Sequence, residues 1–336
     1  MSAPADLATQ PIRTLAPHPS APLPEIGRGV GGGIRRQIGA SDVSVFPLMI
    51  GGAEFGWNID RAQGFAVLDR YAERGGNALH TADSFGAGRS EFILGQWVAS
   101  RRVRDDIVFA VRVGGHPDHP GLGSTNLVRA VEASLRRLGT DRIDLLYLDA
   151  ASASGLVVED VLATADWLVE SGKVRAIGAH GMTAEQLVEA RILSSAGYPR
   201  VEAIDVRYNL LDRGGFEGDL RLVAGAQSLA VTPSTALAHG YLSGAHRSRS
   251  QAAESTRGAQ LASMMNRRGQ KALKILDQVA SDLGQPPAAV AIAWLLSQRE
   301  VTAPIVNAVT PAHVDELVAG VGVHLGRAHR AALASA

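Results

Sequence analysis

From Ile34 onward, short apolar runs alternate with amphipathic stretches, and polar loops separate them. The apolar runs are five to eight residues long, which is typical of buried strands, whereas the amphipathic stretches have the 3.6-residue period of helices. Because the apolar runs contain few polar positions, we expect a parallel sheet covered by helices. The expected strands lie at residues 43–50, 77–81, 107–113, 144–149, 175–180, 202–206, 229–234 and 303–309.

Several amphipathic stretches carry residues that start or stop helices. Thr183 and Gln186 have the spacing of a capping box, in which each side chain hydrogen-bonds the backbone of the other. Three stretches end at a glycine, the residue favoured just after a helix C-terminus. The expected helices lie at residues 61–74, 126–139, 158–172 and 183–197.

The repeated strand–helix rhythm predicts the fold class. Eight units in about 300 residues fit a closed (β/α)8 barrel, a TIM barrel. An open doubly wound sheet is the alternative, but no phosphate-binding loop follows the first strand. Residues 34–47 are expected to form a β-hairpin that caps the bottom of the barrel. Residues 246–270 are polar, and we expect a long loop there that acts as a lid or binds a ligand.

The N-terminal segment differs in composition from the rest. Residues 1–33 are rich in proline, glycine and alanine, so we expect a flexible tail followed by a single domain over residues 34–336. Gly27, Gly29 and Gly32 fit G-x-G-x-x-G, but prolines rather than a strand precede them, so we do not interpret them as a dinucleotide-binding loop. The segment lacks the apolar region of a signal peptide, and we therefore expect a cytoplasmic protein.

Composition narrows the kinds of chemistry. The 336 residues include no cysteine, which excludes disulfides, thiolate catalysis and cysteine-ligated zinc. The formal net charge is +0, so we do not expect nucleic acid as a partner. No apolar run approaches the about 20 residues that span a bilayer, so we expect no membrane partner either, but a small-molecule substrate. The histidines have no H-x-H spacing, and no metal site is expected. The oligomeric state stays open.

Five sequence blocks resemble the aldo-keto reductase family and occur in the same order as in that family. They are "IRRQIGASDVSVFPLMIGGAEFGW", "HTADSFGAGRSEFILGQWV", "SLRRLGTDRIDLLYLD", "YNLLDR" and "PPAAVAIAWLLSQREVTAPIV". The resemblance covers about residues 34–319. It implies a (β/α)8 barrel whose active site lies at the C-terminal ends of the strands, and reduction of a carbonyl group by NADPH.

The resemblance also shows substitutions at the family's catalytic tetrad of aspartate, tyrosine, lysine and histidine. These positions hold His80, Phe85, Arg112 and Asp149. A phenyl ring cannot donate a proton, and a guanidinium does not lose one at ordinary pH. We therefore expect the family's usual reductase chemistry to be absent.

The residues that would hold NADPH in this family are replaced as well. Because the replacements cannot make the same hydrogen bonds and charge interactions, we expect no cofactor, and NADPH binding is the alternative. At the nicotinamide-contact positions the chain has His180, Asp205 and Ser234; at the 2′-phosphate and adenine positions it has Val309 and Leu317.

An acid, a cation and an imidazole nevertheless remain at the tetrad positions. We expect Asp149 to pair with Arg112 and His80 to keep a pKa near neutrality, so that His80, Arg112 and Asp149 catalyse acid–base chemistry. The favoured hypothesis is a non-redox enzyme that dehydrates, isomerises or cyclises a carbonyl-bearing small molecule. Two alternatives stay open: an NADPH-dependent carbonyl reductase with an atypical site, and a non-catalytic binding or regulatory protein with a reductase fold.

Overall fold

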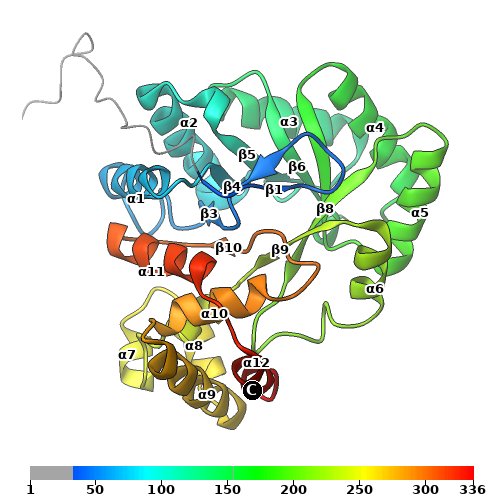
Figure 1. Ribbon diagram of the computed structural model, residues 1–336. Coiled ribbons are helices and arrows are strands. Elements are labelled where there is room, and N and C mark those ends of the chain that lie inside the picture. Colours follow the sequence, from blue (N-terminus) through cyan, green and yellow to red (C-terminus); the bar gives the residue numbers. More distant parts are fainter. Residues whose placement is uncertain (1–32, 154) are drawn as a thin grey trace, which may run out of the picture.

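The computed structural model describes residues 33–153 and 155–336. Eight parallel strands form one sheet in the order β10-β3-β4-β5-β6-β7-β8-β9. Val231 N donates to Glu300 O (3.2 Å) and Thr302 N to Val231 O (2.8 Å), which nearly closes the sheet. The fold is the expected (β/α)8 barrel, not an open sheet (Figure 1). The strands are β3 (Met49–Gly51), β4 (Ala78–Ala82), β5 (Val108–Val113), β6 (Ile143–Asp149), β7 (Val174–His180), β8 (Val201–Arg207), β9 (Ala230–Ser234) and β10 (Ile305–Val306).

Helices surround the barrel, as Figure 1 shows. The predicted capping box is confirmed: Thr183 Oγ1 accepts from Gln186 N at 3.2 Å, and Thr183 N donates to Gln186 Oε1 at 2.9 Å. The α-helices are α1 (Arg61–Glu73), α2 (Arg89–Arg101), α3 (Ser124–Leu138), α4 (Val158–Glu170), α5 (Ala184–Ser195), α6 (Asp219–Gln227), α7 (Arg249–Ala253), α8 (Gly258–Met264), α9 (Arg267–Leu283), α10 (Pro287–Leu296), α11 (Pro311–Gly322) and α12 (Arg327–Ala334). Short 3₁₀ segments are η2 (Phe85–Gly88), η3 (Arg104–Asp106), η4 (Ala150–Ser152) and η5 (Ala238–Ser243).

The expected hairpin cap is present. Strands β1 (Arg36–Gln37) and β2 (Ser44–Val45) pair antiparallel before the barrel begins. Val45 is buried in one apolar cluster with Met49 and Ala78 from the barrel strands. The expected strand 43–50 is divided between β2 and β3, with Pro47, which has no N–H to donate to a ladder, between them.

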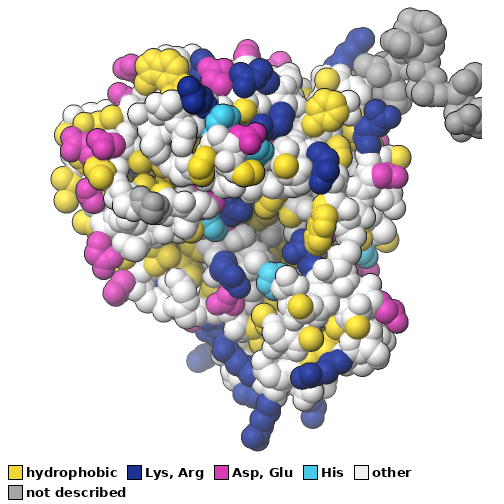
Figure 2. Space-filling view, turned by 180° about the vertical axis from the view of Figure 1, so that it is seen from behind, with side chains coloured by type: hydrophobic (Ala, Val, Ile, Leu, Met, Phe, Trp, Pro, Cys, Tyr) yellow, Lys and Arg dark blue, Asp and Glu magenta, His cyan; other side chains and the backbone are white. Residues whose placement is uncertain are grey.

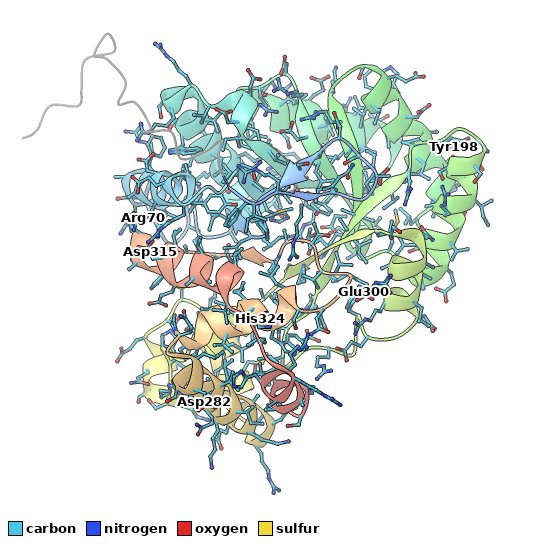
Figure 3. All side chains as sticks on the ribbon, in the orientation of Figure 1. Arg70, Tyr198, Asp282, Glu300, Asp315 and His324 are labelled. Atoms are coloured by element: carbon cyan, nitrogen blue, oxygen red, sulfur yellow. The ribbon has the colours of Figure 1, made fainter. Side chains whose placement is uncertain are left out.

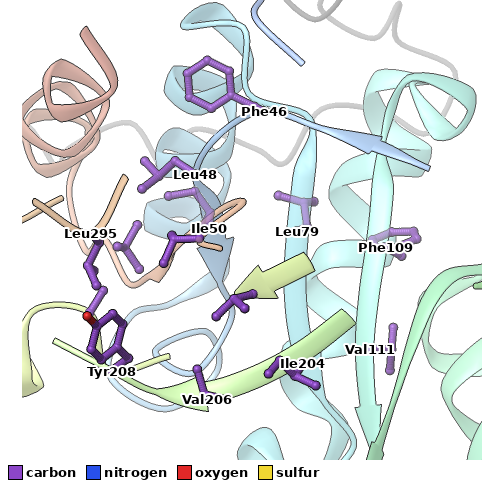
Figure 4. Packing of buried hydrophobic residues seen from close by; sticks show 14 of the residues in the cluster. Phe46, Leu48, Ile50, Leu79, Phe109, Val111, Ile204, Val206, Tyr208 and Leu295 are labelled. Carbon is purple, nitrogen blue, oxygen red and sulfur yellow. The ribbon is translucent and has the colours of Figure 1, made fainter. Parts of the chain in front are cut away.

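The main core lies between the strands and the surrounding helices. Phe46, Leu48 and Ile50 belong to one buried cluster with Leu79 and Phe109 from the next strands (Figure 4). Burying a leucine or phenylalanine side chain contributes about 1.5–3 kcal/mol, so this layer is the main source of stability. The core thus holds the strand ends in fixed positions.

Ion pairs tie some surrounding helices together. Arg70 of α1 binds Asp315 of α11 through two hydrogen bonds, Nε to Oδ1 at 2.9 Å and Nη2 to Oδ2 at 3.0 Å (Figure 3). Arg74 donates to the same Asp315 Oδ1 at 2.6 Å. This contact links the first helix of the barrel to a helix that follows the last strand.

The polar segment 246–270 is helical, which corrects the expectation of a long loop. It contains α7, α8 and the start of α9. Ser248 and Gln251 form a capping box at α7, and the Asn266 side chain accepts from Gly269 N at the start of α9. These caps satisfy backbone N–H groups that a polar sequence by itself would leave to water.

The expected tail and the glycine motif at Gly27, Gly29 and Gly32 lie in residues 1–32, outside the described residues. Within residues 33–153 and 155–336, no helix has the length and apolar character to cross a membrane.

Candidate active site

Polar side chains gather at the C-terminal ends of five neighbouring strands. The strand register places Asp149 beside His180 and His180 beside Asp205 on adjacent strands β6, β7 and β8. In barrels of this kind the loops at these strand ends form the active site. The five residues are His80 (β4), Arg112 (β5), Asp149 (β6), His180 (β7) and Asp205 (β8).

Arg112 lies at the centre of this group. Its Nε is 3.5 Å from Asp149 Oδ2, as the sequence predicts for this pair. Its Nη1 is 3.4 Å from Asp205 Oδ2 and 3.3 Å from His180 Nε2. One guanidinium therefore serves two carboxylates and an imidazole, and its orientation is fixed by all three.

Asp205 is ionised, although its side chain is completely buried (0% exposed). Burial raises the pKa of this carboxyl, but the hydrogen bond from His180 and the electrostatic effects of His180, His80 and Arg112 outweigh burial and lower the pKa to about 2. His180 Nδ1 lies 3.0 Å from Asp205 Oδ2. Because Nδ1 donates to Asp205, Nε2 of a neutral His180 accepts from Arg112.

His80 is neutral at physiological pH, which corrects the expectation of a pKa near neutrality. The ring centroids of Phe85 and Tyr147 are 6.2 and 5.9 Å from that of His80. Burial lowers the pKa of His80 to about 4; the charge of Asp205, 4.0 Å away, raises it, and Arg112 and His180 lower it. His80 thus offers a neutral imidazole to a ligand.

Phe85 stands in the turn that follows β4. The Arg112 guanidinium carbon lies 5.6 Å from the centroid of the Phe85 ring, so the cation faces the aromatic surface. The turn has left-handed backbone at Gly86 (φ 56°), Ala87 (φ 53°) and Gly88 (φ 85°). A phenyl side chain here shields Arg112 but supplies no proton.

Several buried polar atoms of this group make no hydrogen bond. A buried donor or acceptor without a partner costs about 1–3 kcal/mol, so unmet groups need an explanation. They are concentrated among the strand ends around Arg112. The atoms are His80 Nδ1 and Nε2, Arg112 Nε, Asp149 Oδ1 and Asp205 Oδ1.

A cavity of about 540 Å³ lies at the same end of the barrel. We call it the β9–β10 cavity, because its walls come from the segments after β9 and β10, with further residues after β3 and in α11. Its volume is in the range of small-molecule and cofactor sites. Val309 and Leu317, which the family resemblance places at cofactor-contact positions, both line it.

The loop after β9 has strained backbone where it lines this cavity. Thr235 (φ 54°), Ala238 (φ 48°) and His239 (φ 59°) all adopt the left-handed conformation. Such residues cost about 1–3 kcal/mol each and cluster at functional sites. Thr235 Oγ1 is buried and has no hydrogen-bond partner. No sequence pattern predicts the left-handed backbone at Thr235, because a β-branched threonine is not expected at positive φ.

An ion pair joins two sides of the β9–β10 cavity. Arg257, between α7 and α8, donates from Nε to Glu54 Oε1 at 3.0 Å and lies over the ring of Trp57 at 5.4 Å. Glu54 follows β3, 203 residues earlier, so no local pattern reveals the pair. The segment 246–270 therefore contributes a wall of the cavity, and its expected role in ligand binding stays a prediction.

His180 and Asp205 line a different cavity of about 600 Å³, the β7–β8 cavity. His80, Arg112 and Asp149 line neither cavity, and neither does Ser234, whose Oγ donates to Val206 O at 3.3 Å. His80, Arg112 and Asp149, which the resemblance predicts at tetrad positions, thus lie among the strand ends, apart from the walls of both cavities.

The surface of the molecule has a hollow on one face. Figure 2 shows one face hollowed near its middle, with histidine and Lys or Arg side chains around the hollow. Among the residues that the structure describes, no group of three or more His, Asp and Glu is arranged to hold a metal ion.

Comparison with known proteins finds a matching family model and several relatives, and they agree with one another. Residues 47–329 match the sequence model of the Aldo/keto reductase family. Norsolorinic acid reductase B of Aspergillus parasiticus is 28% identical, over 80% of this chain and 74% of that protein. Norsolorinic acid reductase stcV of Emericella nidulans is 32% identical, over 84% of this chain and 76% of that protein. Putative aryl-alcohol dehydrogenase AAD14 of Saccharomyces cerevisiae is 32% identical, over 63% of this chain and 61% of that protein.

Proposed function

The chain belongs to the aldo/keto reductase family, and we propose that it is an oxidoreductase that exchanges hydride between a nicotinamide dinucleotide and the carbonyl or alcohol group of a small molecule. The names of its relatives, two reductases and a dehydrogenase, support a redox reaction. The observation that carries the proposal is the β9–β10 cavity, which lies at the same barrel end as the buried polar group around Arg112.

The residues of the β9–β10 cavity fit the adenosine part of a dinucleotide. Val309 and Leu317 line the cavity at positions where the family contacts this part, and Thr235 Oγ1 is a buried hydroxyl without a partner. Asn307 and His239 add polar groups to the walls. These observations weigh against the expectation that the protein uses no cofactor.

When bound in its reduced form, a nicotinamide dinucleotide supplies the hydride. The role of Arg112 is to stabilise the negative charge that develops on the substrate oxygen, because a fixed guanidinium in a partly buried site needs no reorganisation. His80 is neutral and donates or accepts one hydrogen bond from its unpaired ring nitrogens. Asp149 and Asp205 keep Arg112 in place.

Phe85 determines how the proton reaches the substrate. Neither Phe85 nor Arg112 can release a proton, so the proposed source for the substrate oxygen is water. General acid catalysis by a side chain is worth about 10²–10⁴-fold. We therefore expect slower reduction than from a site with a phenolic acid at residue 85.

A second candidate is the non-redox acid–base reaction predicted from the sequence, a dehydration, isomerisation or cyclisation of a carbonyl compound. The phenyl group of Phe85 favours it, because the usual proton donor for reduction is missing. In that case His180, which hydrogen-bonds Asp205, is the histidine placed to contact a ligand, because it lines the β7–β8 cavity whereas His80 lines neither cavity.

Fluorescence titration with NADH and NADPH, followed by a panel of aldehydes and ketones, distinguishes these candidates. Ala245→Trp fills part of the β9–β10 cavity, and Ala66→Trp is a matched control on the exposed face of α1. The proposal predicts saturable binding that only Ala245→Trp weakens, and turnover that requires the dinucleotide. Turnover without any dinucleotide would favour the second candidate. Absence of both binding and turnover would favour a non-catalytic binding protein.

A further inference from the structure

The charges around the β9–β10 cavity are mainly negative. Among the described residues that line it, the acidic side chains are Glu54 and Glu316, the single Lys or Arg side chain is Arg257, and the histidines are His239, His246 and His313. A phosphate monoester carries about −1.5 to −2 charges at pH 7, so its binding depends on free cations in the wall. Binding of a phosphate monoester in this cavity therefore depends on whether Arg257 is free to contact it.

Arg257 is already occupied. It donates from both Nε and Nη2 to Glu54 Oε1, and its guanidinium lies over the ring of Trp57. Glu54 is 4% exposed, and its Oε2 has no hydrogen-bond partner. If Arg257 turned to a phosphate, a buried carboxylate would lose its counter-ion, which is strongly unfavourable. Arg257 is thus held by Glu54.

His239, in the strained loop after β9, does not replace Arg257 as a cation. Burial lowers the pKa of His239, and the nearby charges of Arg257 and Arg207 lower it further, whereas Asp212 raises it. His239 is therefore neutral at and above pH 7. It can form one hydrogen bond but does not compensate a dianion.

Two backbone positions at the N-terminus of α11 have no free N–H group to donate to a ligand. Helix N-termini commonly bind phosphate through free backbone N–H groups. Here Pro311 occupies the first turn and has no N–H, and His313 N donates to Thr310 Oγ1 at 3.2 Å. The apolar side chain of Val309 precedes this turn at the cavity wall. This end of the cavity is poorly equipped for an additional phosphate.

From these observations we infer that the β9–β10 cavity selects a dinucleotide whose adenosine ribose has a free 2′-hydroxyl, NADH, over its 2′-phosphorylated form, NADPH. The inference rests on the proposed function, because it names the ligand of the same site. A 2′-hydroxyl can donate a hydrogen bond to a carboxylate such as Glu316, whereas a 2′-phosphate meets repulsion there and finds no free Lys or Arg side chain among the described residues that line the cavity.

Isothermal titration calorimetry with NADH, NADPH, 5′-AMP and 2′,5′-ADP tests this selection. The two shorter nucleotides isolate the effect of the 2′-phosphate from that of the nicotinamide. The titrations are made at pH 8, where a histidine with an ordinary pKa is neutral. We expect at least tenfold tighter binding of NADH than of NADPH, and of 5′-AMP than of 2′,5′-ADP.

Val309→Arg and its uncharged control Val309→Gln make the test specific. We expect Val309→Arg to tighten NADPH and 2′,5′-ADP at least fivefold with little change for NADH, and Val309→Gln to do neither. Circular dichroism checks that both variants fold. NADPH binding as tight as NADH binding to the unmodified protein would overturn the inference and leave the proposed function standing. Binding of none of the four nucleotides would overturn both.

Discussion

Arg112 and Asp205 contact each other across the mouth of the barrel, with Nη1 and Oδ2 3.4 Å apart, although strands β6 and β7 lie between theirs. The side chain of Asp205 is completely buried, whereas that of Arg112 is 17% exposed. The Arg112 guanidinium, on a strand that is not adjacent, thus stabilises the ionised form of Asp205. Burial in the barrel would otherwise favour the neutral form of this carboxyl group. Through this pair, the residues predicted at the tetrad positions belong to one connected network: Asp149 contacts Arg112, and Asp205 lies 4.0 Å from His80.

Removing either member of this pair is expected to destabilise the fold. Arg112→Met leaves Asp205 buried without its guanidinium, and we expect a loss of about 3 kcal/mol in the free energy of unfolding, measured by urea denaturation. Asp205→Asn is the partner variant. The double variant should lose clearly less than the sum of the two single losses, because the two groups interact directly. Additive losses would contradict the contact.

His80 predicts a specific pH dependence of stability. Its pKa is about 4 in the fold, below the ordinary histidine value of about 6.5, so the unfolded chain binds more protons between these values. Stability therefore falls as the pH is lowered through 6.5 towards 4, by up to about 3 kcal/mol. The His80→Leu variant lacks this contribution. Urea denaturation at pH 7.5 and 4.5 measures the difference, and identical pH dependence of the two proteins would refute it.

Phe85→Tyr places a phenol beside Arg112 and His80, the residues nearest the site in which the substrate oxygen is proposed to bind. If hydride transfer takes place there, the phenol supplies the missing proton, and kcat for carbonyl reduction should rise at least tenfold. Phe85→Leu is the control without a hydroxyl and should show no such increase. Unchanged kcat in Phe85→Tyr, with the dinucleotide bound, would place the reaction elsewhere.

Asp315 receives hydrogen bonds from Arg70 and Arg74 and so joins α1 to α11 (Figure 3). Its side chain is 34% exposed, so solvent screens the interaction. We expect Asp315→Asn to lower the free energy of unfolding by about 0.5–1 kcal/mol at low salt and by less in 1 M NaCl. Asp282→Asn on α9 is the control and should change stability by less than about 0.5 kcal/mol. Equal losses in the two variants would show that the α1–α11 pair contributes nothing specific.

The sequence predicts the barrel well because its information is local. Continuous apolar runs indicate buried strands, and the Thr183–Gln186 box is visible in four residues. It also predicts the Arg112–Asp149 pair, since adjacent strands bring both to one barrel end. The helices of residues 246–270 escape prediction because short caps, not an apolar period, define them.

Other features depend on tertiary packing. The low pKa of His80 comes from the aromatic and buried surroundings that Phe85 and Tyr147 create, which no spacing along the chain shows. The pairing of Glu54 with Arg257 joins segments that are distant in the sequence. The same holds for the positive φ of Thr235, because local propensity predicts the opposite.

A crystal structure of the protein grown with NAD⁺ tests the central claim most directly. We expect electron density for the adenosine part of NAD⁺ in the β9–β10 cavity, between Val309 and Leu317. The nicotinamide ring should be directed towards Arg112. A β9–β10 cavity without nucleotide density at a saturating concentration of NAD⁺ would contradict the proposal that this barrel is a dinucleotide-dependent oxidoreductase.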